Sequence, residues 1–275
     1  MNRLLGPAEI RDLADLLGLQ PTKKLGQNFV HDANTVRRIV RAAGVEPGDE
    51  VLEVGPGLGS LTLGLLEAGA RVTAVEIDRR LAGQLPGTAA QLAPDAPLTV
   101  LTADALRLTE LPADPRRLVA NLPYNVSVPV LLHLLARFPS LESALVMVQA
   151  EVGERIAAPP GSKVYGSPSA KAAWFGAWAL AGQVSRQVFW PVPNVDSRLV
   201  GYRRGALRGS EAERAATFAL VDAAFGQRRK MLRQSLAEAF GGAAAASAAL
   251  ERAGIDPTDR AERLGVEEFL ALARA

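Results

Sequence analysis

The sequence Asn-Leu-Pro-Tyr-Asn at 121–125 directly follows an apolar run that is typical of a buried strand. An amine attached to an aromatic ring is a poor nucleophile because its lone pair is delocalised into the ring. The side-chain carbonyl of Asn121 and the backbone carbonyl of Leu122 or Pro123 are suited to accept the two hydrogens of such an amine, which turns the lone pair toward a donor. Tyr124 offers a stacking face for a base, worth roughly 1 to 3 kcal/mol. The pattern predicts chemistry on a base amine; the alternative is a strand-ending turn with a buried tyrosine.

A glycine-rich sequence, Glu-Val-Gly-Pro-Gly-Leu-Gly at 53–59, stands between a predicted strand and a predicted helix, where glycines let the backbone approach a ligand. About twenty residues later, Glu76 ends the next predicted strand, where such folds bind ribose hydroxyls. The spacing differs from the dinucleotide pattern, and a charged Glu53 would repel a pyrophosphate. We therefore expect a nucleotide-like cofactor without phosphates, S-adenosylmethionine. A plain tight turn is the alternative.

Asp104 follows the third predicted strand and is suited to accept a hydrogen bond from the adenine amine of that cofactor. The alternative for Asp104 is a capping role in the next segment.

Short apolar runs alternate with amphipathic stretches from residue 50 onward, which is typical of a mostly parallel, doubly wound sheet. We expect helices at 61–68 and 128–137, and two more strands within 172–202. The five candidate strands before them are 51–54, 71–75, 98–101, 117–120 and 144–148.

The character of the chain changes near residue 205, where glycines are followed by alanine-rich helical sequence. We expect a catalytic domain at 1–205, with a helical extension at 1–45, and a small helical domain at 206–275. In the latter, an apolar stripe from Val221 to Leu236 predicts a helix-like stretch.

Composition excludes several kinds of site. The 275 residues include no cysteine and two histidines, which excludes disulfides, thiolate catalysis and cysteine-based zinc sites. We expect no metal and, without a long apolar run, no membrane span. The N-terminal residues mix charges into their apolar positions, so we expect a cytoplasmic protein. Residues 46–150 carry seven basic and twelve acidic residues, so the net basic charge lies in the flanking segments.

Taken together, the motifs resemble those of the KsgA-type small-subunit ribosomal RNA adenine dimethyltransferases, over nearly the whole chain. They are Leu-Gly-Gln-Asn-Phe-Val at 25–30, Gly-Pro-Gly at 55–57, Asn-Leu-Pro-Tyr-Asn at 121–125, Gly-Ser-Lys-Val-Tyr-Gly at 161–166, Pro-Asn-Val-Asp-Ser at 193–197, Phe-Gly-Gln-Arg-Arg-Lys at 225–230 and Arg-Ala-Glu-Arg-Leu at 260–264.

The resemblance implies an α/β fold: the Rossmann-like sheet of class I S-adenosylmethionine-dependent methyltransferases with a small C-terminal all-helical domain. It implies that Asn121 through Tyr124 receive the adenine and that Phe189 is a second stacking aromatic; a core phenylalanine is the alternative. The residues it assigns to the cofactor are Gln27, Asn28, Val30, Gly55, Gly57, Glu76, Ile77, Asp104, Ala105 and Asn121. Those it assigns to RNA phosphates, rather than to a solvated face, are Arg228, Arg229, Lys230 and Arg233.

The activity implied is dimethylation of two adjacent adenosines near the 3′ end of 16S rRNA, in an assembly intermediate of the small subunit, by a monomer. The nearest rival is an Erm-type enzyme that methylates 23S rRNA and confers macrolide resistance. A non-catalytic ribosome-assembly factor would keep the fold for RNA binding alone, and DNA adenine methylation is a further candidate activity. The Gly-Pro-Gly loop and the motifs at 193–197 and 260–264 favour the small-subunit enzyme.

Overall fold

The computed structural model describes residues 4–19 and 28–275, which form two compact units. The first unit contains residues 1–153 and 179–204, and the second contains residues 154–178 and 205–275. The chain therefore passes between the units three times. The boundary expected near residue 205 coincides with the last of these passages, while the segment 154–178 packs with the C-terminal residues although its sequence carries no sign of this.

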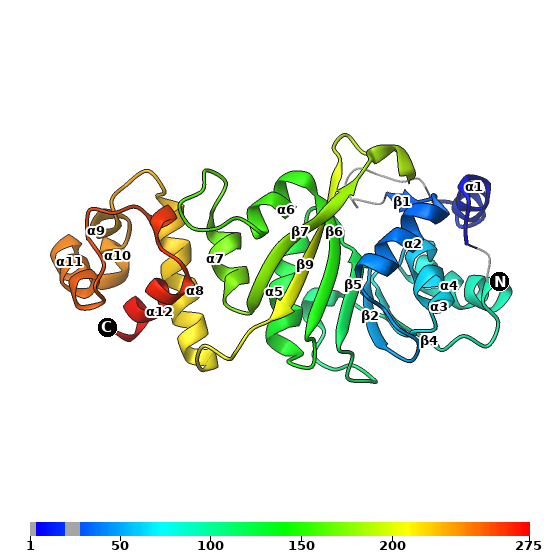
Figure 1. The fold of residues 1–275 in the computed structure, drawn as a ribbon, viewed down its shortest axis with the longest axis horizontal. Coiled ribbons are helices and arrows are strands. Elements are labelled where there is room, and N and C mark those ends of the chain that lie inside the picture. Colours follow the sequence, from blue (N-terminus) through cyan, green and yellow to red (C-terminus); the bar gives the residue numbers. More distant parts are fainter. Residues whose placement is uncertain (1–3, 20–27) are drawn as a thin grey trace. The chain divides into compact units, whose positions relative to one another are not determined.

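The first unit is built on a sheet of seven strands in the order β4-β3-β2-β5-β6-β9-β7. Strands β2 to β6 are all parallel to one another, whereas β9 pairs antiparallel with β6. In Figure 1 the helices α2, α3 and α4 lie on one side of this sheet and α5 on the other. The strands are β2 (Glu50–Val54), β3 (Arg71–Glu76), β4 (Leu98–Thr102), β5 (Arg117–Asn121), β6 (Ser143–Gln149), β7 (Gly176–Val184) and β9 (Ser197–Arg204).

The expected doubly wound α/β fold is confirmed, because the five predicted parallel strands agree with β2 to β6 to within two residues. Strands β2, β3, β5 and β6 are largely buried on both faces and rich in valine and leucine, as a sheet covered on both sides requires, whereas the edge strand β4 is not buried. The helices before and between them are α1 (Pro7–Leu16), α2 (Ala33–Ala42), α3 (Ser60–Glu67), α4 (Arg79–Leu92) and α5 (Ser127–Arg137), with the short η2 (Ala105–Arg107).

A second, two-stranded sheet joins residues far apart in sequence. Here β1 (Phe29–Val30) pairs antiparallel with β8 (Phe189–Trp190), so that Val30 lies opposite Phe189. The sequence predicted two strands within 172–202, and the structure has three, since β8 lies between β7 and β9, after the short η3 (Arg186–Val188). A strand of two residues is too short to show a periodic pattern, which is why it was missed.

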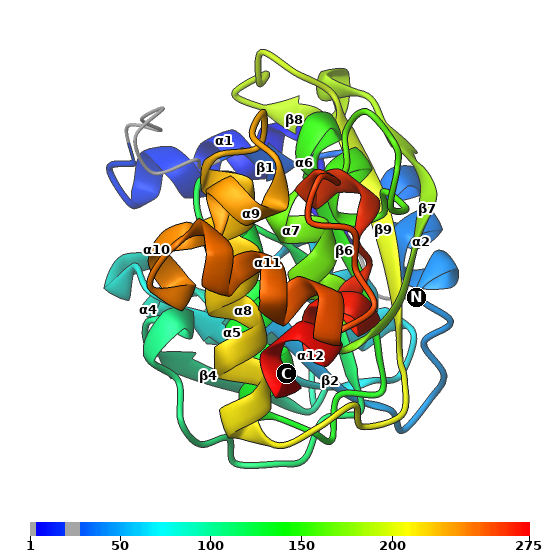
Figure 2. The same cartoon turned by 90° about the vertical axis from the view of Figure 1, so that its left-hand side faces the viewer.

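Helices form the second unit around their own hydrophobic core, which includes Tyr165, Leu232 and Phe269. Figure 2 faces these helices, with α7 and α12 packed against α8. The elements are α6 (Ala150–Ile156), which contains the first passage between the units, α7 (Ser167–Ala173), α8 (Glu211–Gly226), α9 (Leu232–Ser235), α10 (Ala237–Phe240), α11 (Ala243–Arg252), η4 (Ala261–Arg263) and α12 (Val266–Arg274).

One local expectation for this unit is wrong: the stretch from Val221 to Leu236 is not a continuous helix. The helix α8 ends at Gly226, and a turn closed by the bond from Lys230 N to Gln227 O precedes α9. The apolar side chains do point into one core, but Arg228, Arg229 and Lys230 lie on a turn and Arg233 lies in α9.

Candidate active site

The carboxyl ends of β2, β3 and β5 meet at one edge of the sheet and frame a cavity. The strand order runs in opposite directions on either side of the β2–β5 pair, and open α/β sheets bind ligands at such a switch point. The cavity measures about 340 Å³ and is lined by residues 28–30, 53, 55–58, 60–61, 76–78, 81 and 121–124.

The glycine loop that follows β2 brings backbone to the surface of this cavity. Gly55 and Gly57 have φ values of +68° and +58°, which side chains disfavour. A Cβ atom on Gly57 would lie 2.9 Å from Cε1 of Phe29, and one on Gly55 would lie 3.5 Å from Cδ of Pro123. The close approach to Phe29 therefore requires a glycine at position 57, whereas at position 55 the positive φ is the reason for glycine.

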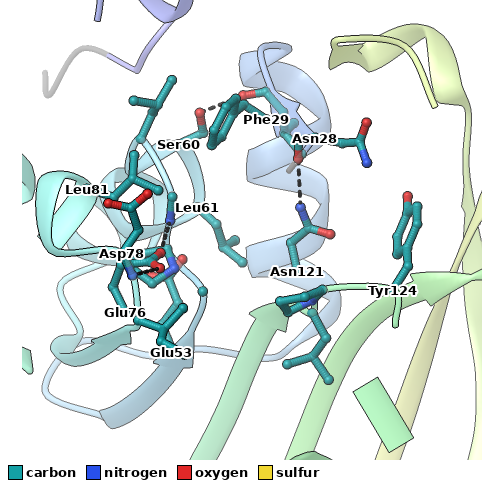
Figure 3. A pocket seen from close by; sticks show the side chains of 18 residues that line it. Asn28, Phe29, Glu53, Ser60, Leu61, Glu76, Asp78, Leu81, Asn121 and Tyr124 are labelled. Atoms are coloured by element: carbon teal, nitrogen blue, oxygen red, sulfur yellow. Dashed lines mark hydrogen bonds between the residues drawn. The ribbon is translucent and has the colours of Figure 1, made fainter. Parts of the chain in front are cut away.

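Two buried carboxyl groups face the glycine loop (Figure 3). Glu76 is 6% exposed and accepts the N–H groups of Gly57 at 3.1 Å and Asp78 at 3.0 Å. Burial raises its pKa, while these two hydrogen bonds act in the opposite direction. Backbone donors thus orient both oxygens of Glu76, and each oxygen keeps a lone pair for a ligand hydroxyl.

Glu53 is 1% exposed and accepts a hydrogen bond from Oγ1 of Thr62 at 2.6 Å. Burial raises its pKa to about 8, and the charge of Glu76 adds to the shift. Glu53 is therefore largely protonated at pH 7, so the repulsion of a pyrophosphate that the sequence suggested for Glu53 is weak. Glu76 supplies the negative charge of the site instead, because the Asp78 carboxylate is paired with Arg80 at 2.9 Å.

The residues after β5 form the other side of the cavity. Nδ2 of Asn121 donates to the backbone oxygen of Asn28 at 3.3 Å, and Figure 3 shows its side-chain oxygen directed to the side where Tyr124 lies. The Tyr124 hydroxyl hydrogen-bonds Oγ of Ser197 at 2.8 Å, and burial raises the pKa of Tyr124. The amide oxygen of Asn121 and the ring of Tyr124 are thereby fixed from two different directions.

Most of the residues predicted from the sequence do meet in this cavity. Those that line it are Asn28, Val30, Gly55, Gly57, Glu76, Ile77, Asn121, Leu122, Pro123 and Tyr124. Gln27 lies outside the residues that the structure describes.

Three predicted residues that the structure describes, Asp104, Ala105 and Phe189, do not line the cavity. Asp104 caps η2 by accepting the N–H of Leu106 at 2.9 Å, which is the capping alternative, and Ala105 follows it in that turn. Phe189 is 1% exposed and belongs to the hydrophobic core behind β1. Both Asp104 and Phe189 lie next to elements of the site, because Ala103 N donates to Glu76 O and Phe189 pairs with Val30.

Sequence reasoning missed Phe29, Ser60 and Leu81 as lining residues. Ser60 Oγ donates to the backbone oxygen of Val30 at 2.5 Å and so ties β1 to the start of α3. The position of Ser60, directly after the glycine loop, was a usable signal. Leu81 gave none, because a leucine in an amphipathic helix is ordinarily a core residue.

The basic residues at 228–230 and 233 lie in the second unit. Arg228 contacts Glu262 at 3.3 Å and donates to the backbone oxygen of Lys163 at 3.0 Å, so it joins two loops of that unit. Arg229, Lys230 and Arg233 are exposed. Arg228 is therefore engaged within its own unit, whereas the other three side chains are exposed to a ligand in solvent.

The described residues offer neither a membrane span nor a metal-binding cluster. No helix among them is long and apolar enough to cross a membrane. No group of three or more histidine, cysteine or acidic side chains in residues 4–19 and 28–275 is arranged to hold a metal ion.

Solved structures with the same architecture include two enzymes that are named a dimethyladenosine transferase and a 23S rRNA methyltransferase. A dimethyladenosine transferase from Plasmodium falciparum superposes with a TM-score of 0.75 at 23% identity, covering 89% of this chain and 95% of that one, and supports the fold. The 23S rRNA methyltransferase ErmE superposes with a TM-score of 0.64 at 28% identity, covering 90% and 98%.

Sequence comparison gives much closer relatives. A protein of Leifsonia xyli subsp. xyli named ribosomal RNA small subunit methyltransferase A is 72% identical over 98% of both chains. Its namesake from Thermobifida fusca is 62% identical over 98% of this chain and 96% of the relative. The family model described as ribosomal RNA adenine dimethylase matches residues 18–275. With the cavity and the Asn-Leu-Pro-Tyr motif in place, the chain belongs to the ribosomal RNA adenine dimethylase family.

Proposed function

We propose that this chain is an S-adenosylmethionine-dependent enzyme that dimethylates the exocyclic amines of two adjacent adenosines near the 3′ end of 16S rRNA. The observation that carries the proposal is the placement of Asn121 at the end of β5, opposite the glycine loop and Glu76 in one cavity. The 72% identity to a small-subunit rRNA methyltransferase over nearly the whole chain supports this substrate.

The residues of the cavity fit S-adenosylmethionine. The close approach of backbone at Gly57 leaves room where a side chain would collide with Phe29, and the carboxylate of Glu76 suits ribose hydroxyls. Ile77, 67% exposed at the rim, offers an apolar face for an adenine ring. The acidic character of this side also suits a cation better than a phosphate.

When bound, S-adenosylmethionine supplies an electrophilic methyl group on a positively charged sulfur. Asn121 accepts one hydrogen of the target amine through its side-chain oxygen, and a backbone carbonyl of the 122–123 segment accepts the other. These two bonds turn the nitrogen lone pair out of conjugation and aim it at the methyl carbon. Asn121 and the backbone carbonyl would hold the amine in this orientation while the bound cofactor supplies the methyl group, and the nitrogen would pass its surplus proton to water.

Positioning supplies most of the rate acceleration in this mechanism. Holding the reacting atoms in line contributes up to about 7 to 11 kcal/mol to barrier lowering. The bond from Asn121 to the Asn28 backbone and the bond from Tyr124 to Ser197 hold the two groups that contact the base. Both bonds fix side chains before the base arrives, so this ordering costs nothing further during the reaction.

The helical unit contributes to the proposal through basic residues on the turn before α9 and in α9 itself. Arg229, Lys230 and Arg233 are exposed and suited to contact phosphates, whereas Arg228 is engaged with Glu262 and the Lys163 backbone. The proposal further includes action by a monomer on an assembly intermediate of the small subunit, in the cytoplasm, without a metal. Asp104, Ala105, Gln27 and Phe189 stay candidates for the rim of the site.

An Erm-type activity is the second candidate, since the same fold and amine chemistry serve both and ErmE covers 90% of this chain. Transfer of labelled methyl groups to unmethylated small and large subunits, followed by nucleoside analysis, separates the two. We expect dimethyladenosine in the small subunit alone. Label in the large subunit alone would establish the Erm-type activity, and cofactor binding without any transfer would favour an assembly factor.

A further inference from the structure

A second hollow, of about 530 Å³ and open to solvent, lies in the first unit between α2 and the segment 183–188. We call it the α2 groove. Asn34, Arg38 and Arg41 share one face of α2, because residues three and four apart are neighbours on a helix. None of the described residues that line it is acidic. They are Asn34, Thr35, Arg38, Arg41, Gln183, Ser185 and Val188.

Neighbouring arginines of α2 have different partners. Arg37 forms a two-point ion pair with Glu67, at 2.8 Å from Nε and 2.9 Å from Nη2. Arg38 instead donates to the backbone oxygen of Gln183 at 3.0 Å, and within the described chain neither Arg38 nor Arg41 forms an ion pair with a carboxylate. A guanidinium has five N–H donors, so the bond of Arg38 fixes its position and leaves most of its donors for a ligand.

Asp32, the residue that precedes α2, is already engaged. Asp32 accepts the N–H of Thr35 at 2.6 Å and caps α2. That hydrogen bond is the main reason why its pKa is lowered, and the charges of His31 and Arg38 add to the effect. The amide of Asn34 and the hydroxyl of Ser185 are exposed at the groove and can donate to an anion.

The groove and the cavity adjoin the same short ladder. Val30 of β1 lines the cavity, and four residues further on Asn34 lines the groove. On the partner strand, Val188 lines the groove and precedes Phe189, which pairs with Val30. His31 N also donates a hydrogen bond to Val188 O at 2.9 Å, which joins the two segments at the groove. A polyanion held in the groove is therefore held beside the cavity that receives the base.

We propose that the α2 groove binds backbone phosphates of the rRNA strand that delivers the target adenosine, through Arg38 and Arg41. This inference rests on the proposed function and adds to it a site on the catalytic unit itself. Arginine binds phosphate through paired N–H donors, and each phosphate neutralised on a single strand releases counterions and steepens the salt dependence of binding.

The test measures the affinity of the full-length protein for unmethylated small subunits over a series of salt concentrations. For the double variant Arg38→Gln/Arg41→Gln we expect affinity at moderate salt to fall at least ~10-fold and the slope of log K against log salt to decrease by about 1.5. The affinity for S-adenosylmethionine is expected to stay within twofold, which also shows that the variant is folded.

Arg37→Gln is the matched control, because it removes the same charge from the same helix at a position tied to Glu67. We expect it to change affinity for the subunit less than twofold. A second variant, Asn34→Glu, places a negative charge in the groove, while a carboxylate in the first turn of α2 favours the helix. It is expected to weaken binding about fivefold or more with no loss of thermal stability.

Two results would overturn the proposal: equal affinities for the double variant and Arg37→Gln, or a loss of affinity with an unchanged salt slope. Failure of the proposed function is distinguishable from either, since it would appear as wild-type protein that does not methylate the small subunit.

Discussion

The two sides of the active-site cavity are built differently. The side formed by residues 53–61 and 76–81, the cofactor wall, holds buried carboxyl groups, and backbone N–H groups orient both oxygens of Glu76. The side formed by Asn28 and residues 121–124, the acceptor wall, has no ionisable group except the Tyr124 hydroxyl. The side chains of Asn121 and Tyr124 are each held by a hydrogen bond to a distant part of the chain.

The difference separates binding from chemistry. A cationic, hydroxyl-bearing cofactor gains from buried negative charge on the cofactor wall. A neutral amine needs acceptors in a fixed direction and no strong base, which the acceptor wall supplies. Changes on the acceptor wall should therefore reduce the rate, and changes on the cofactor wall should reduce cofactor affinity.

The largest effect is expected for Asn121→Ala. Without the amide oxygen the amine is no longer turned toward the methyl donor, so the single-turnover rate of methyl transfer should fall at least ~100-fold. Cofactor affinity, measured by titration calorimetry, should stay within about threefold. A normal rate in this variant would show that the acceptor wall does not orient the amine.

The next effect concerns cofactor affinity. Glu76→Gln removes a charged acceptor whose oxygens are already oriented, and a hydrogen bond to a charged group is worth about 1.5 to 3 kcal/mol. The dissociation constant for S-adenosylmethionine should rise roughly 10- to 100-fold, while the rate at saturating cofactor changes little. If Glu76→Gln left the affinity for S-adenosylmethionine unchanged and lowered the rate of methyl transfer, the roles assigned to the two walls would be wrong.

A smaller effect is expected in the pH dependence of stability. The pKa of Glu53 is raised from 4.5 to about 8 in the folded chain, so the folded state binds more protons than the unfolded state between these values. Stability should then fall as the pH rises through this window, at no more than about 1.4 kcal/mol per pH unit from this group. Denaturant unfolding of Glu53→Gln from pH 4.5 to 8 should lack this contribution. If the free energies of unfolding of the two proteins changed with pH in parallel, the raised pKa of Glu53 would be contradicted.

The smallest effect is expected for Tyr124→Phe. The ring that stacks on the base is kept, so methyl transfer should change less than about threefold, although Oγ of Ser197 loses its partner. Tyr124→Ala is the matched comparison, and it should lower the affinity for the base about 5- to 100-fold through lost stacking. Equal rates and affinities for the two variants would remove Tyr124 from the acceptor wall.

The sequence predicted those parts of the site whose signal is local. Gly55, Gly57 and Asn121 stand directly after strands, and strand ends can be read from the apolar pattern. The placement of Arg228 was not predictable, because its partners Glu262 and Lys163 are 34 and 65 residues away. The membership of residues 154–178 in the second unit is likewise decided by tertiary packing.

Glu53 shows a different limit. Its position in the motif was plain, but its ionisation depends on how completely the fold removes it from water, which no local pattern states. The sequence argument against a pyrophosphate used a charge that burial largely removes, and the carboxylate of Glu76 supplies negative charge there instead. The placements of Asp104 as a cap and of Phe189 in the core are also decided by the fold, and the roles predicted for both residues stay predictions.

The ladder between β1 and β8 has a consequence for the order in which the site is made during synthesis. The glycine loop, Glu76 and Asn121 all leave the ribosome within the first half of translation, as parts of β2, β3 and β5. Residues 189–190, which pair with β1, and Ser197, which holds Tyr124, emerge much later. A nascent chain of about 150 residues thus carries every group that we assign to methyl transfer but lacks the strand that pairs with β1 and the hydroxyl that holds Tyr124. These two supports of the site arrive only with the last third of the polypeptide.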